Sequence, residues 1–472
     1  MNLTLGDIAA CLQPAKLIGR PETLFTRVHT DTRSIQAGDL FVAIKGDNFD
    51  ANSMLPLAGS SGAAAVIAHV APPVAMAGFT VPDTRAALGQ LGSFWRKRFT
   101  GPLIAVTGSN GKTTVTQILA SILRAHAGAA AHATKNSFNN DIGLPLTLLA
   151  LNAGHSHAVV EIGMNHVGEI NTLAALAMPT VALVNNAQRE HQEFMGTVQA
   201  VAEENACVFA HTQAGGVAVF PANDAYSSLW AKTAQQHGLT TLRFGPGGDV
   251  TGNATWQASS GGGGFLLRIH TPKGELQALL RMPGAHNVHN ALAACACAVA
   301  AGVPLPAIAS GIDAFQAVKG RSHLLALQGR YAPLALIDDS YNANPDSVRA
   351  AIDVLASMSG PRWLVLGDMG EVGDLGPAFH AEVGSYAAQR GVDRLVTMGE
   401  LATHAASAFS AAVGRTAFHA TSLAELTTEL DNSLPQAGVV LVKGSRFMRM
   451  ERVVAHIQSM GGPAATESTN AA

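Results

Sequence analysis

Short apolar runs recur along the chain, between longer segments whose apolar residues are spaced as on one face of a helix. The clearest runs are residues 103–106, 157–160, 181–184, 334–337, 363–366, 394–397 and 439–442. Continuous apolar runs of this length are typical of strands that are buried on both faces of a parallel sheet. Their alternation with helical segments therefore predicts an α/β fold.

Two other segments show different patterns. Near the start of the chain, shorter strands at 40–44 and 63–68 are mixed with turn residues, which predicts a small α/β unit. Later, residues 265–270 and 276–281 alternate between apolar and polar positions on either side of a Pro-Lys-Gly turn. This alternation predicts an antiparallel hairpin at the edge of the main sheet.

These patterns divide the chain into three domains and a tail. We expect a small α/β domain at 1–83, a central parallel-sheet domain at 84–317 that starts with a helix, and a C-terminal Rossmann-like domain at 318–460. The small and polar residues 461–472 are expected to form a flexible tail. A length of 472 residues agrees with several domains, because it exceeds the size of a single ordinary one.

Composition narrows the possible classes of protein. Hydrophobic residues make up 48% of the chain and charged residues 13%, which is enough apolar material for sizeable cores. The formal net charge of −3 argues against nucleic acid or an anionic membrane surface as a partner. No signal peptide is apparent, and the most apolar stretch, 62–78, is interrupted by two prolines. We therefore expect a cytoplasmic protein that does not insert into a membrane.

A glycine-rich segment follows the apolar run at 103–106 and leads into a helical pattern at 115–124. It consists of Thr107, Gly108, Ser109, Asn110, Gly111, Lys112, Thr113 and Thr114. Glycines there let backbone N–H groups converge on phosphate oxygens, and the start of the helix adds partial positive charge. Lys112 can reach the β and γ phosphates of a nucleotide, and the Thr113 hydroxyl can bind Mg²⁺.

The spacing of this segment departs from the usual phosphate loop, because Val106 stands where that loop has its first glycine. The alternative is a glycine turn that only joins a strand to a helix. A lysine and two threonines between a strand and a helix favour a loop that binds phosphate.

Polar residues also follow other predicted strands of the central domain. Glu161 comes directly after an apolar run, at the strand end where parallel sheets bind ligands, and is either a metal ligand or an ordinary loop residue. His191 lies in a polar segment and can bind a metal or a phosphate, or lie on the surface. Asn287 and Asn290 can present amides to a nucleotide, although Asn290 is equally suited to cap a helix.

The C-terminal domain repeats this arrangement with different residues. Asp338 and Asp339 end the run at 334–337 and precede a polar stretch that is rich in turn residues. Lys443 and Arg446 follow the last apolar run and offer positive charge to an anion. Turn formation alone explains the asparagines and the proline of the polar stretch equally well.

Taken in order, these segments resemble the Mur ligases over essentially the whole chain. The segments that carry the resemblance are 31–33, 38–43, 107–114, 140–145, 161–166, 338–345, 366–371 and 443–446. The resemblance implies a ligase that uses ATP and Mg²⁺ to join D-alanyl-D-alanine to UDP-N-acetylmuramoyl-tripeptide, through an acyl phosphate, in peptidoglycan precursor synthesis. It also implies one domain each for the UDP-sugar, the ATP and the incoming amino component, in a protein that acts as a monomer.

The resemblance further implies roles for individual residues. The UDP-sugar would contact Asp31, Thr32 and Arg33. The catalytic groups would be Lys112, Glu161, His191, Arg321 and Asp339, and the metal ligands would be Thr113, Glu161 and His191. ATP would contact Gly108, Ser109, Asn110, Gly111, Lys112, Thr113, Thr114, Asn287, Asn290, Arg321 and Asp339. The peptide substrates would contact Asn342, Lys443, Ser445 and Arg446.

Many Mur ligases carry a carbamylated lysine in the helix after the metal-binding histidine. The corresponding segment of this chain, 201–207, contains no lysine. We hypothesise that Glu203 or Glu204 supplies the negative charge directly.

Three other functions compete with this one. Another Mur ligase or a folylpolyglutamate synthase would share the chemistry but use a different substrate. A phosphate-loop kinase or switch NTPase would use the nucleotide without forming an amide bond, and would not need the C-terminal domain. A passive binding protein is least favoured, because Lys112, Glu161 and His191 together make a costly way to hold a ligand.

Overall fold

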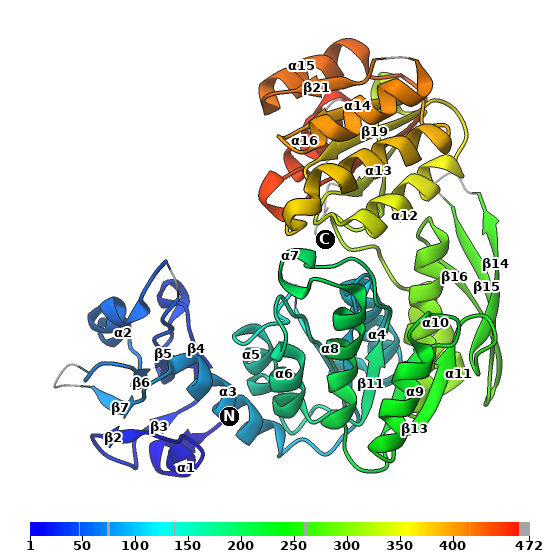
Figure 1. The fold of residues 1–472 in the computed structure, drawn as a ribbon. Helices are drawn as coiled ribbons and strands as arrows, with labels where there is room; N and C mark the ends of the chain where they lie inside the picture. The colour runs from blue at the N-terminus through cyan, green and yellow to red at the C-terminus, as the bar shows by residue number, and fades with distance from the viewer. Residues whose placement is uncertain (47, 73–75, 136, 259–262, 415, 462–472) are drawn as a thin grey trace, which may run out of the picture.

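The computed structural model describes residues 1–46, 48–72, 76–135, 137–258, 263–414 and 416–461. Its strands form three α/β units that follow one another along the chain (Figure 1). The N-terminal unit lies apart from the other two, whereas the C-terminal unit faces the central one. From residue 462 onward, the tail expected at 461–472 lies outside the described residues. None of the described helices is both long enough and apolar enough to cross a membrane.

The N-terminal unit contains a five-stranded sheet in the order β2-β7-β6-β5-β4. Its strands are β2 (Lys16–Ile18), β4 (Arg27–His29), β5 (Asp39–Val42), β6 (Ala65–Ala68) and β7 (Ala77–Thr80). β4 to β7 run parallel and β2 pairs antiparallel with β7. β5 and β6 confirm the two strands predicted here, and every residue in them is buried. The unit is completed by β1 (Leu3–Thr4), β3 (Leu24–Phe25), α1 (Leu5–Ala9) and α2 (Leu55–Ser60).

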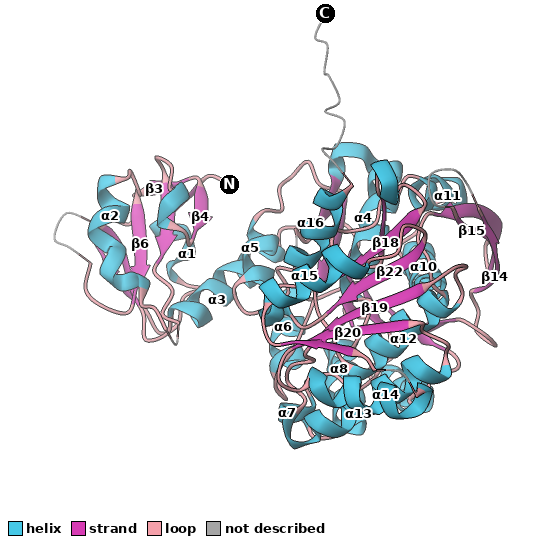
Figure 2. Cartoon of the chain, turned by 90° about the horizontal axis from the view of Figure 1, so that it is seen from above, coloured by secondary structure: helices cyan, strands magenta, loops and turns pink. Residues whose placement is uncertain are grey.

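Helix α3 (Thr84–Arg96) joins the N-terminal unit to the central one (Figure 2). The predicted helix is confirmed here. The buried side chain of Arg96 donates hydrogen bonds to the carbonyls of Ala177 and Met178, at the end of a helix of the central unit. A positive charge is favourable at the C-terminus of a helix, so this contact holds α3 against the central unit.

The central unit is built on six parallel strands in the order β13-β12-β11-β8-β10-β9. They are β8 (Leu103–Thr107), β9 (Ala131–Ala133), β10 (His157–Glu161), β11 (Val181–Val184), β12 (Val217–Pro221) and β13 (Thr240–Phe244). β8, β10 and β11 confirm the three runs predicted for this unit. Because all six strands are parallel, their carboxyl ends meet at one edge of the sheet.

Helices cover both faces of the central sheet, as parallel strands require. One face packs against α4 (Lys112–Ala127), α10 (Ala285–Ala300) and α11 (Leu305–Asp313). The other packs against α5 (Gly143–Leu149), α6 (Glu169–Ala177), α8 (Val198–Ala210) and α9 (Ser227–Gln236). The predicted hairpin is part of a three-stranded antiparallel sheet of β14 (Thr251–Gln257), β15 (Gly264–Thr271) and β16 (Gly274–Leu280).

The C-terminal unit has a second six-stranded sheet in the order β17-β18-β22-β19-β20-β21. Its strands are β17 (His323–Ala326), β18 (Leu334–Asp339), β19 (Arg362–Gly367), β20 (Arg394–Met398), β21 (Phe418–Ala420) and β22 (Gly438–Lys443). Only β17 is antiparallel to its neighbour. The four predicted strands are confirmed as β18, β19, β20 and β22. The covering helices are α12 (Pro345–Ala356), α13 (Gly376–Gln389), α14 (Ala402–Val413), α15 (Leu423–Ser433) and α16 (Glu451–Met460).

Candidate active site

The carboxyl ends of the central strands open onto a cavity of 1170 Å³ that the C-terminal unit borders on the other side. Many of the residues expected at the active site line this cavity: Ser109, Asn110, Gly111, Lys112, Thr113, Thr114, Glu161, His191, Asn287, Asn290, Arg321, Asp339, Asn342 and Lys443. The others lie outside the cavity lining: Gly108, Asp31, Thr32, Arg33, Ser445 and Arg446.

The predicted phosphate loop connects β8 to α4, with Gly108 at φ +126° and Gly111 at φ +86°. A Cβ at Gly111 would lie 2.3 Å from Oδ1 of Asn290, so a side chain does not fit there. The N–H group of Asn110 donates a hydrogen bond to Oδ1 of Asn186, two residues after β11 (Val181–Val184). The loop is therefore held against the neighbouring strand, with the start of α4 facing the cavity, as in a phosphate-binding loop.

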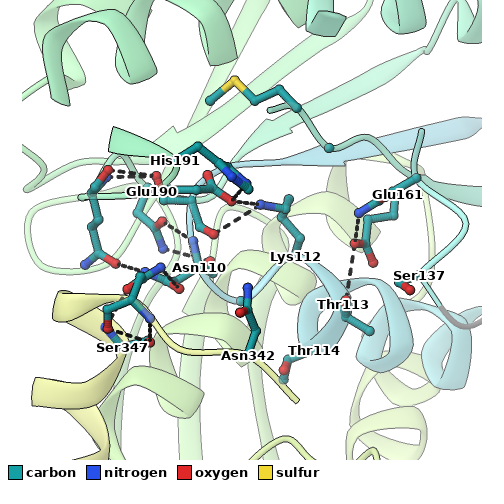
Figure 3. Close-up of a pocket in the computed structure, with 18 of the residues that line it drawn as sticks. Asn110, Lys112, Thr113, Thr114, Ser137, Glu161, Glu190, His191, Asn342 and Ser347 are labelled. Carbon is teal, nitrogen blue, oxygen red and sulfur yellow. Dashed lines mark hydrogen bonds and ion pairs between the residues drawn. The ribbon is translucent and has the colours of Figure 1, made fainter. Parts of the chain in front are cut away.

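The side chain of Lys112 folds back onto this loop (Figure 3). Its ammonium group donates hydrogen bonds to the carbonyls of Gly108 at 2.6 Å and Ser109 at 3.1 Å, and lies 2.5 Å from Oε1 of Glu190. All three donors of the ammonium group are thus engaged within the protein. Glu190 is buried, and its Oε2 has no hydrogen-bond partner in the described parts of the chain. A phosphate group can therefore compete with Glu190 for Lys112.

Glu161 ends β10 beside the first turn of α4. Its Oε1 accepts hydrogen bonds from the Thr113 hydroxyl at 3.2 Å and from Nδ2 of Asn139 at 2.7 Å. The side chain is 1% exposed, and Oε2 has no hydrogen-bond partner among the described residues. A buried carboxylate oxygen without a partner is costly, so this oxygen is suited to receive a ligand.

The oxygens of Thr113 and Glu161 fit Mg²⁺, which prefers oxygen ligands and commonly takes the rest from water and substrate phosphates. Within the described ranges, no group of three or more His, Cys, Asp or Glu side chains is arranged to hold a metal by itself. His191 lies on the Glu190 side of Lys112, opposite Thr113 and Glu161 in Figure 3. The structure thus brings two of the three expected metal ligands into contact and places the third with Glu190.

His191 adopts a left-handed backbone conformation, with φ +48°, just before the short helix α7 (Gln192–Met195). Its Nε2 lies 3.6 Å from Oε1 of Glu190, and its Nδ1 lies 2.6 Å from Oε2 of Glu371. Glu371 belongs to the C-terminal unit, and its contact with the ring of His191 lowers the pKa of its carboxyl group. Far from being a surface histidine, His191 is 14% exposed at its side chain, and its ring lies between the carboxylates of Glu190 and Glu371.

Asn287 and Asn290 form a chain of side-chain hydrogen bonds behind the phosphate loop. Nδ2 of Asn290 donates to Oδ1 of Asn287, and Nδ2 of Asn185 donates to Oδ1 of Asn290. Nδ2 of Asn185 also donates to the carbonyl of Asn110. Asn287 and Asn290 both line the cavity, but their hydrogen bonds within the protein support the phosphate loop.

Asp339 and Lys443 form a buried ion pair of 2.6 Å in the C-terminal unit. They are opposite each other in the register of β18 and β22. Burial raises the pKa of Asp339, but the charge and hydrogen bond of Lys443 outweigh it and hold the pKa below its usual value. Lys443 also donates to the carbonyl of Asn342. Lys443 therefore neutralises Asp339 here, whereas we had expected it to face a substrate carboxylate.

Two other residues expected to contact the peptide differ in exposure. The Ser445 hydroxyl is buried and accepts a hydrogen bond from the N–H group of Gly370. Arg446 is exposed and, like Arg321, lies against the ring of Tyr341. The guanidinium groups of Arg446 and Arg321 are 5.6 Å and 4.2 Å from the ring centroid, and that of Arg446 also pairs with Glu451 at 3.0 Å.

The expected sugar-binding residues lie in the N-terminal unit, away from the cavity. Asp31 accepts a hydrogen bond from the backbone N–H of Arg33 and pairs with its guanidinium group at 2.7 Å. The side-chain hydrogen bond from Arg33 is the main reason that the pKa of Asp31 falls to about 2. The side chain of Arg33 is 88% exposed, so it remains accessible to a ligand.

Sequence reasoning missed Glu190 and Arg189, which precede His191. Arg189 pairs with Asp346 and with Glu382 of the C-terminal unit, each at 2.6 Å. The only signal in the sequence is that charged residues surround His191, and this does not indicate which partners they find.

The hypothesis that Glu203 or Glu204 supplies charge to the site is wrong for this structure. Oε1 of Glu203 accepts a hydrogen bond from Gln199, on the same helix. The carboxylate of Glu204 accepts the backbone N–H of Ile170, near the start of α6, where negative charge is favourable. Neither side chain lines the cavity. The negative charge nearest to Lys112 is instead that of Glu190.

Fold and site together define an α/β protein with a phosphate loop at the carboxyl edge of a parallel sheet. Residues 106–298 match the Mur ligase middle domain, and residues 320–446 match the domain described as Mur ligase, glutamate ligase domain. The chain belongs to the Mur ligase family.

Curated relatives match nearly the full length of the chain. The UDP-N-acetylmuramoyl-tripeptide–D-alanyl-D-alanine ligase of Haemophilus influenzae is 37% identical over 96% of this chain and 98% of its own length. The ligase of the same name from Escherichia coli is 36% identical over 98% of this chain and 99% of its own. A crystal structure of MurF from Acinetobacter baumannii has a TM-score of 0.87 and 33% identity, covering 97% of this chain and 99% of that one.

Proposed function

We propose that this chain is an ATP-dependent ligase that joins D-alanyl-D-alanine to UDP-N-acetylmuramoyl-tripeptide and releases ADP and phosphate. The observation that carries the proposal is a phosphate loop, with Lys112 held by Glu190, at a cavity that the C-terminal unit also lines. The ligases named for this reaction, which match nearly the whole chain, support the choice of substrates. The reaction belongs to the cytoplasmic synthesis of peptidoglycan precursors.

ATP binds with its phosphates on the loop from Gly108 to Thr114. The backbone of the loop and the start of α4 face the phosphate oxygens, and Lys112 exchanges Glu190 for the γ-phosphate. Arg321, on the opposite side of the cavity, adds a second positive charge. Both groups stabilise the negative charge that spreads over the phosphoryl group during transfer.

The reaction needs activation because a carboxylate is a poor acyl donor at neutral pH. A carboxylate oxygen of the tripeptide attacks the γ-phosphorus, the new P–O bond forms, and the bond to ADP breaks. The amine of D-alanyl-D-alanine then attacks the carbonyl carbon, the C–N bond forms, and phosphate leaves with one of the original carboxylate oxygens. The proton lost by the amine passes to solvent.

Thr113 and Glu161 are the residues that would hold Mg²⁺, with His191 on the other side of Lys112 as a further ligand. When bound, the ion supplies positive charge to the phosphate oxygens. The oxygen of Glu161 without a hydrogen-bond partner supports this assignment.

We assign the UDP-sugar to the domain at 1–83, ATP to the domain at 84–317 and the dipeptide to the domain at 318–460. The exposed guanidinium group of Arg33 supports the first assignment, because it suits a diphosphate. Arg446 supports the third, because its side chain is 58% exposed and a peptide carboxylate can compete with Glu451 for its guanidinium group.

The test measures phosphate release from ATP and Mg²⁺ with the UDP-linked tripeptide, with and without D-alanyl-D-alanine. We expect release to require the dipeptide, and mass spectrometry to find the tripeptide heavier by one dipeptide less one water. Parallel reactions with D-glutamate, diaminopimelate or a folate in place of the dipeptide should give no product. Equal phosphate release with and without the dipeptide would contradict the proposal.

A further inference from the structure

Three consecutive residues, Gln188, Arg189 and Glu190, contact three different parts of the site. Oε1 of Gln188 accepts a hydrogen bond of 2.6 Å from Nδ2 of Asn110, in the phosphate loop. Oε1 of Glu190 lies 2.5 Å from the ammonium group of Lys112 (Figure 3). Arg189 is not among the residues that line the cavity and instead pairs with the C-terminal unit. The segment therefore connects the phosphate loop and Lys112 to the other side of the boundary between the two units.

Arg189 is bound to the C-terminal unit by its side chain and by its backbone. Its Nε and Nη2 donate to Asp346 at 3.1 Å and 2.6 Å, and its Nη1 donates to Glu382 at 2.6 Å. Its backbone N–H group donates to Oδ2 of Asp346 at 2.8 Å. The guanidinium group also lies 5.2 Å from the centroid of the Phe379 ring. A planar guanidinium group that binds two carboxylates at once allows few geometries, so these contacts fix the position of Arg189.

The start of α12 reaches the phosphate loop by a second route. Asp346 lies in the first turn of α12, and Asn344 caps the helix by accepting a hydrogen bond from the N–H group of Ser347. This cap fixes the orientation of the Asn344 amide, so that its Nδ2 faces the loop and donates to Oδ1 of Asn110 at 3.0 Å. The side chain of Asn110 is therefore held by Gln188 from the central unit and by Asn344 from the C-terminal unit.

We infer that Arg189 is a positioning residue through which docking of the C-terminal unit fixes the phosphate loop. Its guanidinium group donates to Asp346 and Glu382, so it acts on the loop through the residues on either side of it. Fixing Arg189 also fixes Gln188 and Glu190, which hold the loop and Lys112. Such a coupling is reciprocal, so a nucleotide on the loop in turn favours docking of the C-terminal unit. The role of the nucleotide rests on the proposed function, whereas the link between the loop and the C-terminal unit does not.

The test compares Arg189→Met and Arg189→Lys with the control Arg349→Met, in the full-length protein. Arg349 also pairs with Glu382, at 2.8 Å, and its guanidinium group lies 4.2 Å from the centroid of the Tyr386 ring. All three of these residues belong to the C-terminal unit. The control therefore removes a positive charge from the same carboxylate without affecting a contact across the boundary.

The first readout is hydrogen–deuterium exchange of the ligand-free protein, followed by mass spectrometry of peptides that contain the phosphate loop. The N–H groups of Ser109 and Asn110 donate to the carbonyl and to Oδ1 of Asn186, so their exchange reports whether the loop is held in place. Peptides that contain β12 report global unfolding of the central unit in the same samples. The second readout is the affinity for a non-hydrolysable ATP analogue with Mg²⁺, measured by calorimetry.

We expect Arg189→Met to raise the exchange rate of the loop about tenfold, to leave that of β12 unchanged, and to weaken binding of the analogue about tenfold. Arg189→Lys should show smaller effects, because it keeps the charge but not the planar guanidinium group. Arg349→Met should match the wild type. Unchanged loop exchange or unchanged affinity in Arg189→Met would overturn the inference, and so would equal effects in Arg349→Met. An error in the proposed function would instead appear as a wild-type protein that does not bind the analogue, and loop exchange would still test the link between the two units.

Discussion

The carboxyl edges of the two six-stranded sheets face the same cavity, and each ends a strand in an acidic residue that is mostly removed from solvent. In the central sheet, Glu161 ends β10 and keeps one oxygen without a hydrogen-bond partner in the described structure. In the C-terminal sheet, Asp339 ends β18, and both of its oxygens accept hydrogen bonds, from Lys443 and from Ser322. The two acids have similar places in similar sheets. They differ in whether a carboxylate oxygen remains available to a ligand.

This difference separates residues that bind a ligand from residues that stabilise the fold. Burying a carboxylate is costly unless charge or hydrogen bonds compensate it. Asp339 is compensated within the protein and therefore stabilises the C-terminal unit. The burial of Glu161 is compensated only in part. This lowers the stability of the protein unless a ligand binds the oxygen that has no partner. Three substitutions test the contrast between the two edges, and a fourth tests the N-terminal unit for comparison.

The largest effect is expected from Lys112→Met. Loss of the ammonium group removes charge stabilisation from phosphoryl transfer, and kcat should fall by about 10³-fold. The double variant with Glu190→Gln separates chemistry from folding, because it also removes the buried carboxylate that Lys112 neutralises. Its thermal unfolding midpoint should return towards that of the wild type while its rate stays low. If either variant kept activity within tenfold of the wild type, the reaction would not take place at the carboxyl edge of the central sheet.

Lys443→Met should act on stability. It leaves Asp339 buried without its partner, and the free energy of unfolding should fall by about 3–5 kcal/mol in urea titrations. Adding Asp339→Asn should recover most of that loss. The competing view, in which Lys443 binds a peptide carboxylate, requires unchanged stability and a higher KM for the dipeptide.

Glu161→Gln should have opposite effects on activity and stability. Activity should fall by about 10²-fold, because the metal loses a charged ligand. Unfolding of the ligand-free protein should require about 1 kcal/mol more, because a buried amide costs less than a buried carboxylate. Asp339→Asn is the matched control, and it should destabilise the protein because Lys443 loses its counter-ion. Destabilisation by Glu161→Gln would remove the distinction between the two edges.

The smallest effect is expected from Arg33→Ala in the N-terminal unit. Its guanidinium group is exposed, so stability should not change. The KM for the UDP-linked tripeptide should rise about tenfold with kcat retained, as expected for the loss of one charged hydrogen bond. Gln36→Ala, in the same loop region, is a suitable control for nonspecific disturbance. An unchanged KM would mean that Arg33 does not contact the UDP-sugar.

The sequence predicted those parts of the fold that depend on local pattern. β18, β19, β20 and β22 are continuous apolar runs, and burial on both faces is what makes them visible. β21 was missed because it is a three-residue edge strand in which only one residue is buried. β17 was missed because it is also an edge strand and has no fully buried residue.

The active site also has features that the local sequence pattern predicted and features that it did not. The phosphate loop was predicted because a strand, a glycine turn and a helix follow one another in the sequence, and Glu161 was predicted because it directly follows another apolar run. The pairing of Lys443 with Asp339 was not predicted, because it follows from β18 and β22 being neighbours, which periodicity does not reveal, and contact of Lys443 with a substrate stays a prediction. The contact of His191 with Glu371 joins two separate units, so no local signal could have indicated it.

The most direct test of the account follows an oxygen atom. UDP-N-acetylmuramoyl-tripeptide labelled with ¹⁸O in the carboxylate to be ligated is incubated with the enzyme, ATP, Mg²⁺ and D-alanyl-D-alanine, and the released phosphate is analysed by mass spectrometry. Activation of that carboxylate by phosphoryl transfer predicts one ¹⁸O atom in each phosphate released during ligation. Phosphate without ¹⁸O would contradict the account, because the carboxylate would then never have been bonded to phosphorus.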